Sequence, residues 1–152
     1  MCANIASRLI VSTLDRLLAR ARARLTRLEP HAAWDAVQQG AILVDTRPEF
    51  QRRADGEIPG AIVIERNHLE WRLHPQSDWR IPEAVDADVQ WIIFCDESYA
   101  SSLAAAMLQM IGLRRATDLA GGFKAWRTAG LPVSFPVTVT PQRMQTERAG
   151  GT

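Results

Sequence analysis

Four short, mostly apolar runs, separated by segments of helical character, constrain the fold of this chain more than any other sequence feature. The runs cover residues 41–45, 61–64, 90–95 and 116–119. A short continuous apolar run is typical of a strand that is buried on both faces of a parallel sheet. Strands that alternate with helices at such spacings predict an α/β fold, in which helices cover both faces of the sheet.

The predicted helices lie between these runs. The segment at 99–111 is rich in alanine, leucine and methionine, and Gly112 follows it as an end signal. Shorter helices are expected at residues 31–37, 48–53, 68–71 and 123–128. A chain of 152 residues is long enough for one complete core, so we predict one domain. Its predicted bounds are residues 26–133.

A separate amphipathic helix is predicted over residues 1–25. Its apolar residues recur at helical spacing, with arginines between them: Ile5, Leu9, Leu14, Leu17, Leu18 and Leu25. We favour packing on its own domain or on a second copy over a membrane-surface or nucleic-acid role, which the basic face would also allow. At the other end, residues 134–152 are polar and without period, which predicts a loosely ordered tail.

Composition narrows the classes of partner and compartment. The chain has 18 basic and 17 acidic residues, and a net charge of +1 gives no general attraction to nucleic acid or to membranes. Arginines interrupt the apolar runs of the first 25 residues, and no run reaches the roughly 18 residues of a membrane span. The two cysteines, Cys2 and Cys95, do not form the dense pattern of a secreted disulfide scaffold, so a cytoplasmic protein is expected.

Cys95 is the main candidate for a reactive residue. It ends the run 90–95 and precedes the predicted helix 99–111, which places it at the carboxyl edge of the sheet, where open α/β sheets bind ligands. Main-chain N–H groups at a helix N-terminus lack helical acceptors and stabilise an anion, which for cysteine is the nucleophilic thiolate. From these residues alone, a small buried cysteine with no reactivity is an equally open interpretation.

Four motifs in order resemble the rhodanese (sulfurtransferase) domain over roughly residues 26 to 133. They are Asp45-Thr46-Arg47, Gly56-Glu57-Ile58-Pro59-Gly60-Ala61, Cys95, and Gly121-Gly122-Phe123-Lys124-Ala125-Trp126. The resemblance implies a five-stranded parallel sheet with flanking helices. It also implies that the cysteine accepts a sulfane sulfur, forms a persulfide and passes the sulfur to a nucleophilic acceptor, which is covalent catalysis.

The resemblance also implies roles for particular residues. Cys95 would carry the persulfide, within a cradle formed by the amides of Asp96, Glu97, Ser98, Tyr99, Ala100 and Ser101. Asp45 and Arg47 would form a structural ion pair at the strand end, and Gly121-Gly122 a close connection beneath the site. Arg66 lies just past the second strand and is a candidate supporting residue, although an exposed arginine is the better expectation. No cofactor is implied, and the histidines at 31, 68 and 74 lack the spacing of a metal site.

The active loop departs from the pattern of the family. The family commonly has an arginine or lysine beside the cysteine and another near the end of the loop, where this chain has Asp96 and Ala100. The family also commonly has a glycine in the middle of the loop, where this chain has Ser98. Two carboxylates at 96 and 97 would oppose an anionic donor, each by on the order of 1 kcal/mol at an exposed site. We therefore expect inefficient transfer from thiosulfate, and a better fit for a persulfide or small thiol. Ser101 and Ser102 provide no guanidinium for an oxyanion, which argues against a phosphatase or an arsenate reductase.

Two hypotheses of function follow. The first is a sulfurtransferase or sulfur carrier that takes sulfur from thiosulfate, a persulfide or mercaptopyruvate and delivers it to a thiol or another nucleophilic acceptor. The second is a catalytically weak or inactive rhodanese-like module that binds or regulates a partner. In the second, the N-terminal helix would serve for homodimerisation or for docking a protein partner.

Overall fold

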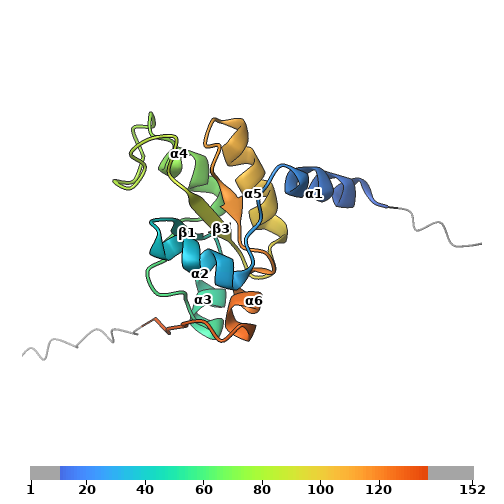
Figure 1. The fold of residues 1–152 in the computed structure, drawn as a ribbon, viewed down its shortest axis with the longest axis vertical. Helices are drawn as coiled ribbons and strands as arrows, with labels where there is room; N and C mark the ends of the chain where they lie inside the picture. The colour runs from blue at the N-terminus through green and yellow to red at the C-terminus, as the bar shows by residue number, and fades with distance from the viewer. Residues whose placement is uncertain (1–10, 137–152) are drawn as a thin grey trace, which may run out of the picture.

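A parallel sheet of four strands lies between two layers of helices in the computed structural model, which describes residues 11–136 (Figure 1). The strand order is β2-β1-β3-β4. The strands are β1 (Ile42–Asp45), β2 (Ile62–Val63), β3 (Trp91–Phe94) and β4 (Thr117–Asp118). Each falls within one of the four predicted runs, so the predicted α/β class and parallel sheet are confirmed.

The expectation of a fifth strand is wrong. The place beside β4 is taken by a single residue, Leu28, which forms an isolated parallel bridge with Leu119. The Leu28 amide donates to the carbonyl of Asp118 at 3.1 Å, and the Leu28 carbonyl accepts from the amide of Ala120 at 2.8 Å. Pro30 begins a helix two residues later, so the pairing cannot extend into a strand.

Helices flank the sheet on both faces. They are α1 (Thr13–Ala23), α2 (Pro30–Gln38), α3 (Glu49–Asp55), α4 (Leu69–Leu73), α5 (Tyr99–Met110) and α6 (Gly122–Thr128), and a 3-10 turn, η1 (Arg66–His68), precedes α4. Alternate side chains of the two central strands point to opposite faces of the sheet. Those that cluster with α2 and α6 are Leu43, Ile92 and Phe94. Those that cluster with α4 and α5 are Val44, Trp91 and Ile93. Burial of each such side chain contributes about 1.5–3 kcal/mol, so the two clusters fix the strands that carry the site.

The helix α1 lies beside α5 at the periphery of the molecule (Figure 1). A capping box sets its start: the Ser12 hydroxyl accepts from the Asp15 amide at 3.0 Å, and the Asp15 carboxylate accepts from the Ser12 amide at 3.2 Å. α1 covers the second half of the helix predicted over residues 1–25. Residues 1–10 lie outside the described part of the chain.

The C-terminal segment stays paired with the domain as far as Ser134, which is the first residue of the tail that composition predicts. Ser134 forms an antiparallel bridge with Glu57. The Glu57 amide donates to the Ser134 carbonyl at an N-to-O distance of 2.6 Å, and the Ser134 amide donates to the Glu57 carbonyl at 2.9 Å. This approach needs Gly56, because a Cβ there would lie 2.5 Å from Cγ1 of Val133. The predicted tail therefore begins in paired structure, and residues 137–152 fall outside the description. Within residues 11–136, none of the helices combines the length and hydropathy that a membrane crossing requires.

Candidate active site

Cys95 follows the last residue of β3 and lies four residues before α5, at the carboxyl edge of the sheet. Its side chain is half-buried, and its Sγ lies 3.3 Å from Oγ of Ser101. Ser101 is fully buried in the first turn of α5. The Ser101 hydroxyl can accept from the thiol or donate to a thiolate at the same position.

The main-chain amides around Cys95 are free to serve an anion. Within residues 11–136, none of the N–H groups of residues 96–101 donates to a protein acceptor, and α5 begins without a side-chain cap. Such uncommitted N–H groups at a helix start favour a negative charge. The hydrogen bond that the structure gives the sulfur itself goes to Ser101 and not to an amide. The predicted amide cradle for the sulfur stays a prediction.

Ser98 shapes the loop. Its backbone is left-handed, with φ of 70° and ψ of 16°, and it is the one residue other than glycine with positive φ in the described part of the chain. A non-glycine residue in this region costs roughly 1–2 kcal/mol. Its hydroxyl is buried and accepts from Nη2 of Arg27 at 2.9 Å and from the amide of Gly121 at 3.2 Å. Serine therefore supplies an acceptor that glycine at this position would lack.

Arg22 of α1 braces the same loop. Its Nη2 donates to the carbonyl of Ser98 at 3.0 Å, and its Nε donates to Oγ of Ser102 at 3.0 Å. The guanidinium also lies 5.4 Å from the ring centroid of Tyr99. Tyr99 is otherwise exposed, as is Ala100. The N-terminal helix is thus bonded directly to the segment that carries Cys95.

A fully buried carboxylate, Asp118, anchors this network from β4. It accepts from Nε and Nη2 of Arg27, with a shortest distance of 2.9 Å, and from Oγ of Ser102 at 2.9 Å. Sequence reasoning missed Asp118, Ser102, Arg22 and Arg27. Asp118 lies within the predicted strand at residues 116–119 and is the last residue of β4, at the same sheet edge as Cys95, so the edge argument would have found it. The two arginines lie more than 70 residues from their partners in the loop, and no local pattern indicates them.

Lys124 of α6 offsets the two carboxylates of the loop. Its Nζ lies 2.5 Å from Oε1 of Glu97 and 3.3 Å from Oδ2 of Asp96. The hydrogen bond to Glu97, and then that to Asp96, raises the pKa of Lys124 above its usual range, so the ammonium is charged throughout the neutral region. The three groups together carry a charge of −1, where the two carboxylates alone carry −2. The repulsion of anionic donors is therefore weaker than the sequence predicts.

The Asp45–Arg47 ion pair lies buried at the end of β1. Nη2 of Arg47 is 2.8 Å from Oδ2 of Asp45, and both side chains are almost completely buried. The guanidinium also donates to the carbonyl of Gly56 at 2.9 Å and lies 3.9 Å from the ring centroid of Phe123 in α6. Arg66 lies elsewhere: it pairs with Glu70 at 2.7 Å and lines a groove between α1 and α5.

The start of α6 holds the backbone of the active loop. The amide of Phe123 donates to the carbonyl of Cys95 at 2.9 Å, and the amide of Lys124 donates to that of Asp96 at 3.1 Å. Gly122 makes this approach feasible, because a Cβ there would lie 2.6 Å from both carbonyl oxygens. The close connection predicted at Gly121-Gly122 is confirmed.

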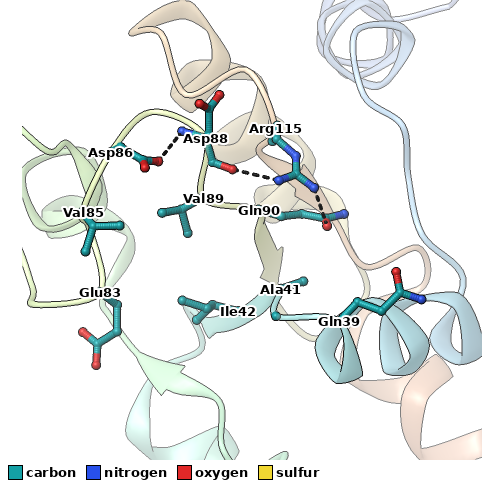
Figure 2. Close-up of a pocket in the computed structure, with 11 residues that line it drawn as sticks. Gln39, Ala41, Ile42, Glu83, Val85, Asp86, Asp88, Val89, Gln90 and Arg115 are labelled. Carbon is teal, nitrogen blue, oxygen red and sulfur yellow. Dashed lines mark hydrogen bonds between the residues drawn. The ribbon is translucent and has the colours of Figure 1, made fainter.

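Two hollows lie at opposite edges of the sheet. One, of about 430 Å³, borders the active loop and is lined by Asp55, Asp96, Phe123, Lys124, Arg127 and Thr128. Figure 2 shows the other, of about 360 Å³, beside the starts of β1 and β3, where Arg115 donates to the carbonyl of Asp88 and to Oε1 of Gln90. None of the predicted site residues lines this second hollow. The first, which has Lys124 and Arg127 on its wall beside Asp55 and Asp96, is the one that adjoins the active loop.

Known proteins resemble this chain in sequence and in fold. The family model of the rhodanese-like domain matches residues 29–129. The thiosulfate sulfurtransferase GlpE of Haemophilus influenzae is 33% identical over 106 residues, which cover 70% of this chain and 91% of that protein. A solved structure from Rhodopseudomonas palustris, of unknown function and described as a possible tyrosine phosphatase, is 29% identical with a TM-score of 0.72. That match covers 88% of this chain and 99% of the other.

The polysulfide-sulfur transferase homodimer of Wolinella succinogenes shares the fold, with a TM-score of 0.67 at 22% identity, over 86% of this chain and 93% of that one. The family match spans the sheet, the Cys95 loop and α6, and leaves α1 outside it. The chain belongs to the rhodanese-like domain family.

Proposed function

We propose that this protein is a sulfurtransferase that carries a sulfane sulfur as a persulfide on Cys95. The observation that carries the proposal is the half-buried Cys95 beside a run of amides, at residues 96–101, that have no acceptor in the described part of the chain. A persulfide anion extends the negative sulfur by one atom, and these N–H groups and the Ser101 hydroxyl would stabilise it. The thiosulfate sulfurtransferase relatives support the same chemistry.

The proposed cycle has two displacements at sulfur. The Cys95 thiolate attacks the sulfur that the donor transfers, and the bond that holds this sulfur breaks, which is S–S in thiosulfate or a persulfide and C–S in mercaptopyruvate. The leaving group departs with the electron pair: sulfite from thiosulfate, a thiolate from a persulfide, and the enolate of pyruvate from mercaptopyruvate. An acceptor thiolate then attacks the outer sulfur of the Cys95 persulfide. The acceptor leaves as a persulfide, and the electron pair of the broken bond restores the Cys95 thiolate.

Donor preference follows from the charges near the loop. Lys124 and Arg127 line the adjacent hollow, and Lys124 offsets much of the charge of Asp96 and Glu97. We therefore propose that thiosulfate is a usable donor, although slower than a protein-bound persulfide, with mercaptopyruvate as a third candidate and a small thiol as the acceptor. We also propose a cytoplasmic location, because a reducing compartment keeps a single thiol available for this cycle.

Mass spectrometry of the intact protein tests the proposal. After incubation with thiosulfate, mercaptopyruvate or a persulfide donor, the wild type should gain the mass of one sulfur atom, and a thiol should remove it. Cys95→Ala should gain nothing, whereas Cys2→Ala, the matched control, should load like the wild type. If no donor adds sulfur to the wild type, the carrier function is wrong. The weak or inactive binding module then takes its place.

Phosphoryl chemistry is the second candidate, because of the description of the R. palustris relative. Arg22 and Arg27 lie against the loop, but both donate to its own groups: Arg22 to the carbonyl of Ser98 and Arg27 to the Ser98 hydroxyl. Neither of these two guanidinium groups is left to clamp a phosphate beside Cys95. We expect no hydrolysis of p-nitrophenyl phosphate above the level of Cys95→Ala. Turnover that depends on Cys95 would favour the phosphatase instead.

A further inference from the structure

We propose that the groove between α1 and α5 binds an acidic amphipathic helix of a partner protein. The groove has a volume of about 410 Å³, and its wall is almost entirely apolar. None of the residues that line it belongs to the Cys95 loop at residues 95–101, so the proposal goes beyond sulfur transfer and does not depend on it.

Two helical stripes form the apolar wall. α1 contributes Leu17 and Ala21, and α5 contributes Leu103, Ala106, Met107 and Met110. Leu17, Met107 and Met110 are 53, 41 and 64% exposed, whereas the two alanines are 7% exposed and form the floor. Small residues below and large apolar residues at the sides leave room for side chains that enter from outside. This is the geometry of a helix-in-groove site, and methionine adapts to such ligands.

The charge around the groove selects the partner. Three arginines lie on the rim: Arg20 from α1, Arg24 at the C-cap of α1, and Arg66 from η1. Arg66 is paired with Glu70, but Arg20 and Arg24 form no ion pair within residues 11–136. No carboxylate lines the groove. A helix with carboxylates beside its apolar stripe would meet unshared guanidinium groups on the α1 side.

A second copy of this chain fits the rim poorly. α1 and its C-cap residue carry four arginines, Arg16, Arg20, Arg22 and Arg24, against a single acid, Asp15. Two such grooves placed face to face would bring unpaired guanidinium groups together, which opposes association. A membrane fits poorly as well, because the apolar side chains line a hollow between two helices, which a flat lipid surface cannot enter. A partner helix satisfies both the shape and the charge.

A designed peptide probes this site on the full-length protein. The peptide is a labelled helix with leucines at i, i+4 and i+7 and glutamates along both sides of that stripe. We expect saturable binding by fluorescence anisotropy that weakens with added salt. A peptide of the same composition in scrambled order, and one with lysines in place of the glutamates, should bind about tenfold or more weakly.

Matched variants locate the binding. Leu17→Glu and Arg24→Glu should each weaken binding about tenfold. Leu14→Glu and Arg16→Glu are the controls, because both residues are exposed on α1 and neither lines the groove. All four changes are at exposed residues, and unchanged thermal unfolding would show that each variant is folded.

Several outcomes would overturn the proposal. Equal binding of all three peptides, or equal loss in the control variants, would remove a specific groove. Light scattering that finds a wild-type dimer and a monomeric Leu17→Glu variant would assign the groove to a second copy. Sedimentation of the wild type with phosphatidylglycerol vesicles, abolished by Leu17→Glu, would assign it to a membrane.

Discussion

Ser98 of the active loop combines an unfavourable backbone conformation with favourable hydrogen bonds of its side chain. Its left-handed backbone costs roughly 1–2 kcal/mol, which glycine would avoid. Its hydroxyl accepts part-buried hydrogen bonds from Arg27 and Gly121, and each such bond contributes about 0.5–1.5 kcal/mol. With two donors against one backbone term, the hydrogen bonds outweigh the strain.

The order of stability among Ser98 variants tests this balance. Ser98→Gly relieves the backbone and loses the acceptor, so we expect a net loss of about 1 kcal/mol in the free energy of unfolding. Ser98→Ala loses the acceptor without that relief and should fall about 1–2 kcal/mol further. Urea denaturation measures both variants. A Ser98→Gly protein more stable than the wild type would show that the strain dominates.

The charge of Lys124 is predicted to favour the approach of anionic donors. Lys124→Ala leaves the charges of Asp96 and Glu97 without their cation, so we expect loading of Cys95 from thiosulfate to slow about tenfold at low salt. Salt should shrink the difference. A neutral trisulfide donor should load both proteins at similar rates, and an equal loss with both donors would contradict the electrostatic role.

The pH dependence of this effect has a definite sign. The carboxylates raise the pKa of Lys124, so its charge is retained through neutral and mildly alkaline pH. The stabilising contribution of the pair is complete below the ordinary lysine pKa and disappears as the pH rises through the raised one. The loading rates of wild type and Lys124→Ala should therefore differ at neutral pH and converge only at strongly alkaline pH.

At the scale of elements, α6 and α1 hold the Cys95 loop from two sides. α6 does so through Gly122, where a methyl group would collide with the carbonyls of Cys95 and Asp96. Gly130 is a matched comparison, since its φ of 74° resembles the 65° of Gly122 and no atom lies within 4 Å of its Cβ position. Gly130→Ala should cost only the backbone strain of roughly 1–2 kcal/mol.

Gly122→Ala should cost more than Gly130→Ala and should also slow alkylation of Cys95 by iodoacetamide, because the loop must move away from α6. Thermal unfolding and the alkylation rate, measured on both variants, separate the two effects. Similar losses of stability for the two variants would show that the contact with the loop is not tight.

α1 acts on the loop through Arg22. Arg22→Ala removes the donors to the Ser98 carbonyl and to Ser102, so we expect sulfur loading to slow several-fold, with partial recovery in Arg22→Lys, which keeps one donor group. Arg16→Ala, on the same helix without a loop contact, should load at the wild-type rate. If Arg22→Ala loses stability but loads normally, α1 has only a structural role.

At the scale of the whole molecule, sequence reasoning succeeded where a property is local. The runs at β1 and β3 are continuous and apolar, and the position of Cys95 follows from the strand before it and the helix after it. The prediction of a fifth strand was wrong because Pro30 begins α2 and so ends the pairing after Leu28. The sequence pattern does not show this, since the bridge depends on how Leu28 lies beside Leu119 in the fold. Lys124 lies inside the motif at residues 121–126, yet its effect on the charges of Asp96 and Glu97 depends on the distance between α6 and the loop.

The supports of the loop could not be predicted, since Arg22 and Arg27 meet Ser98 across more than 70 residues. Both arginines also precede residue 29, where the match to the family begins. A fusion protein that contains only residues 29–129 would therefore keep Cys95 and lose the two guanidinium groups that bond to its loop. Such a graft should begin no later than Ser12, the residue that caps α1.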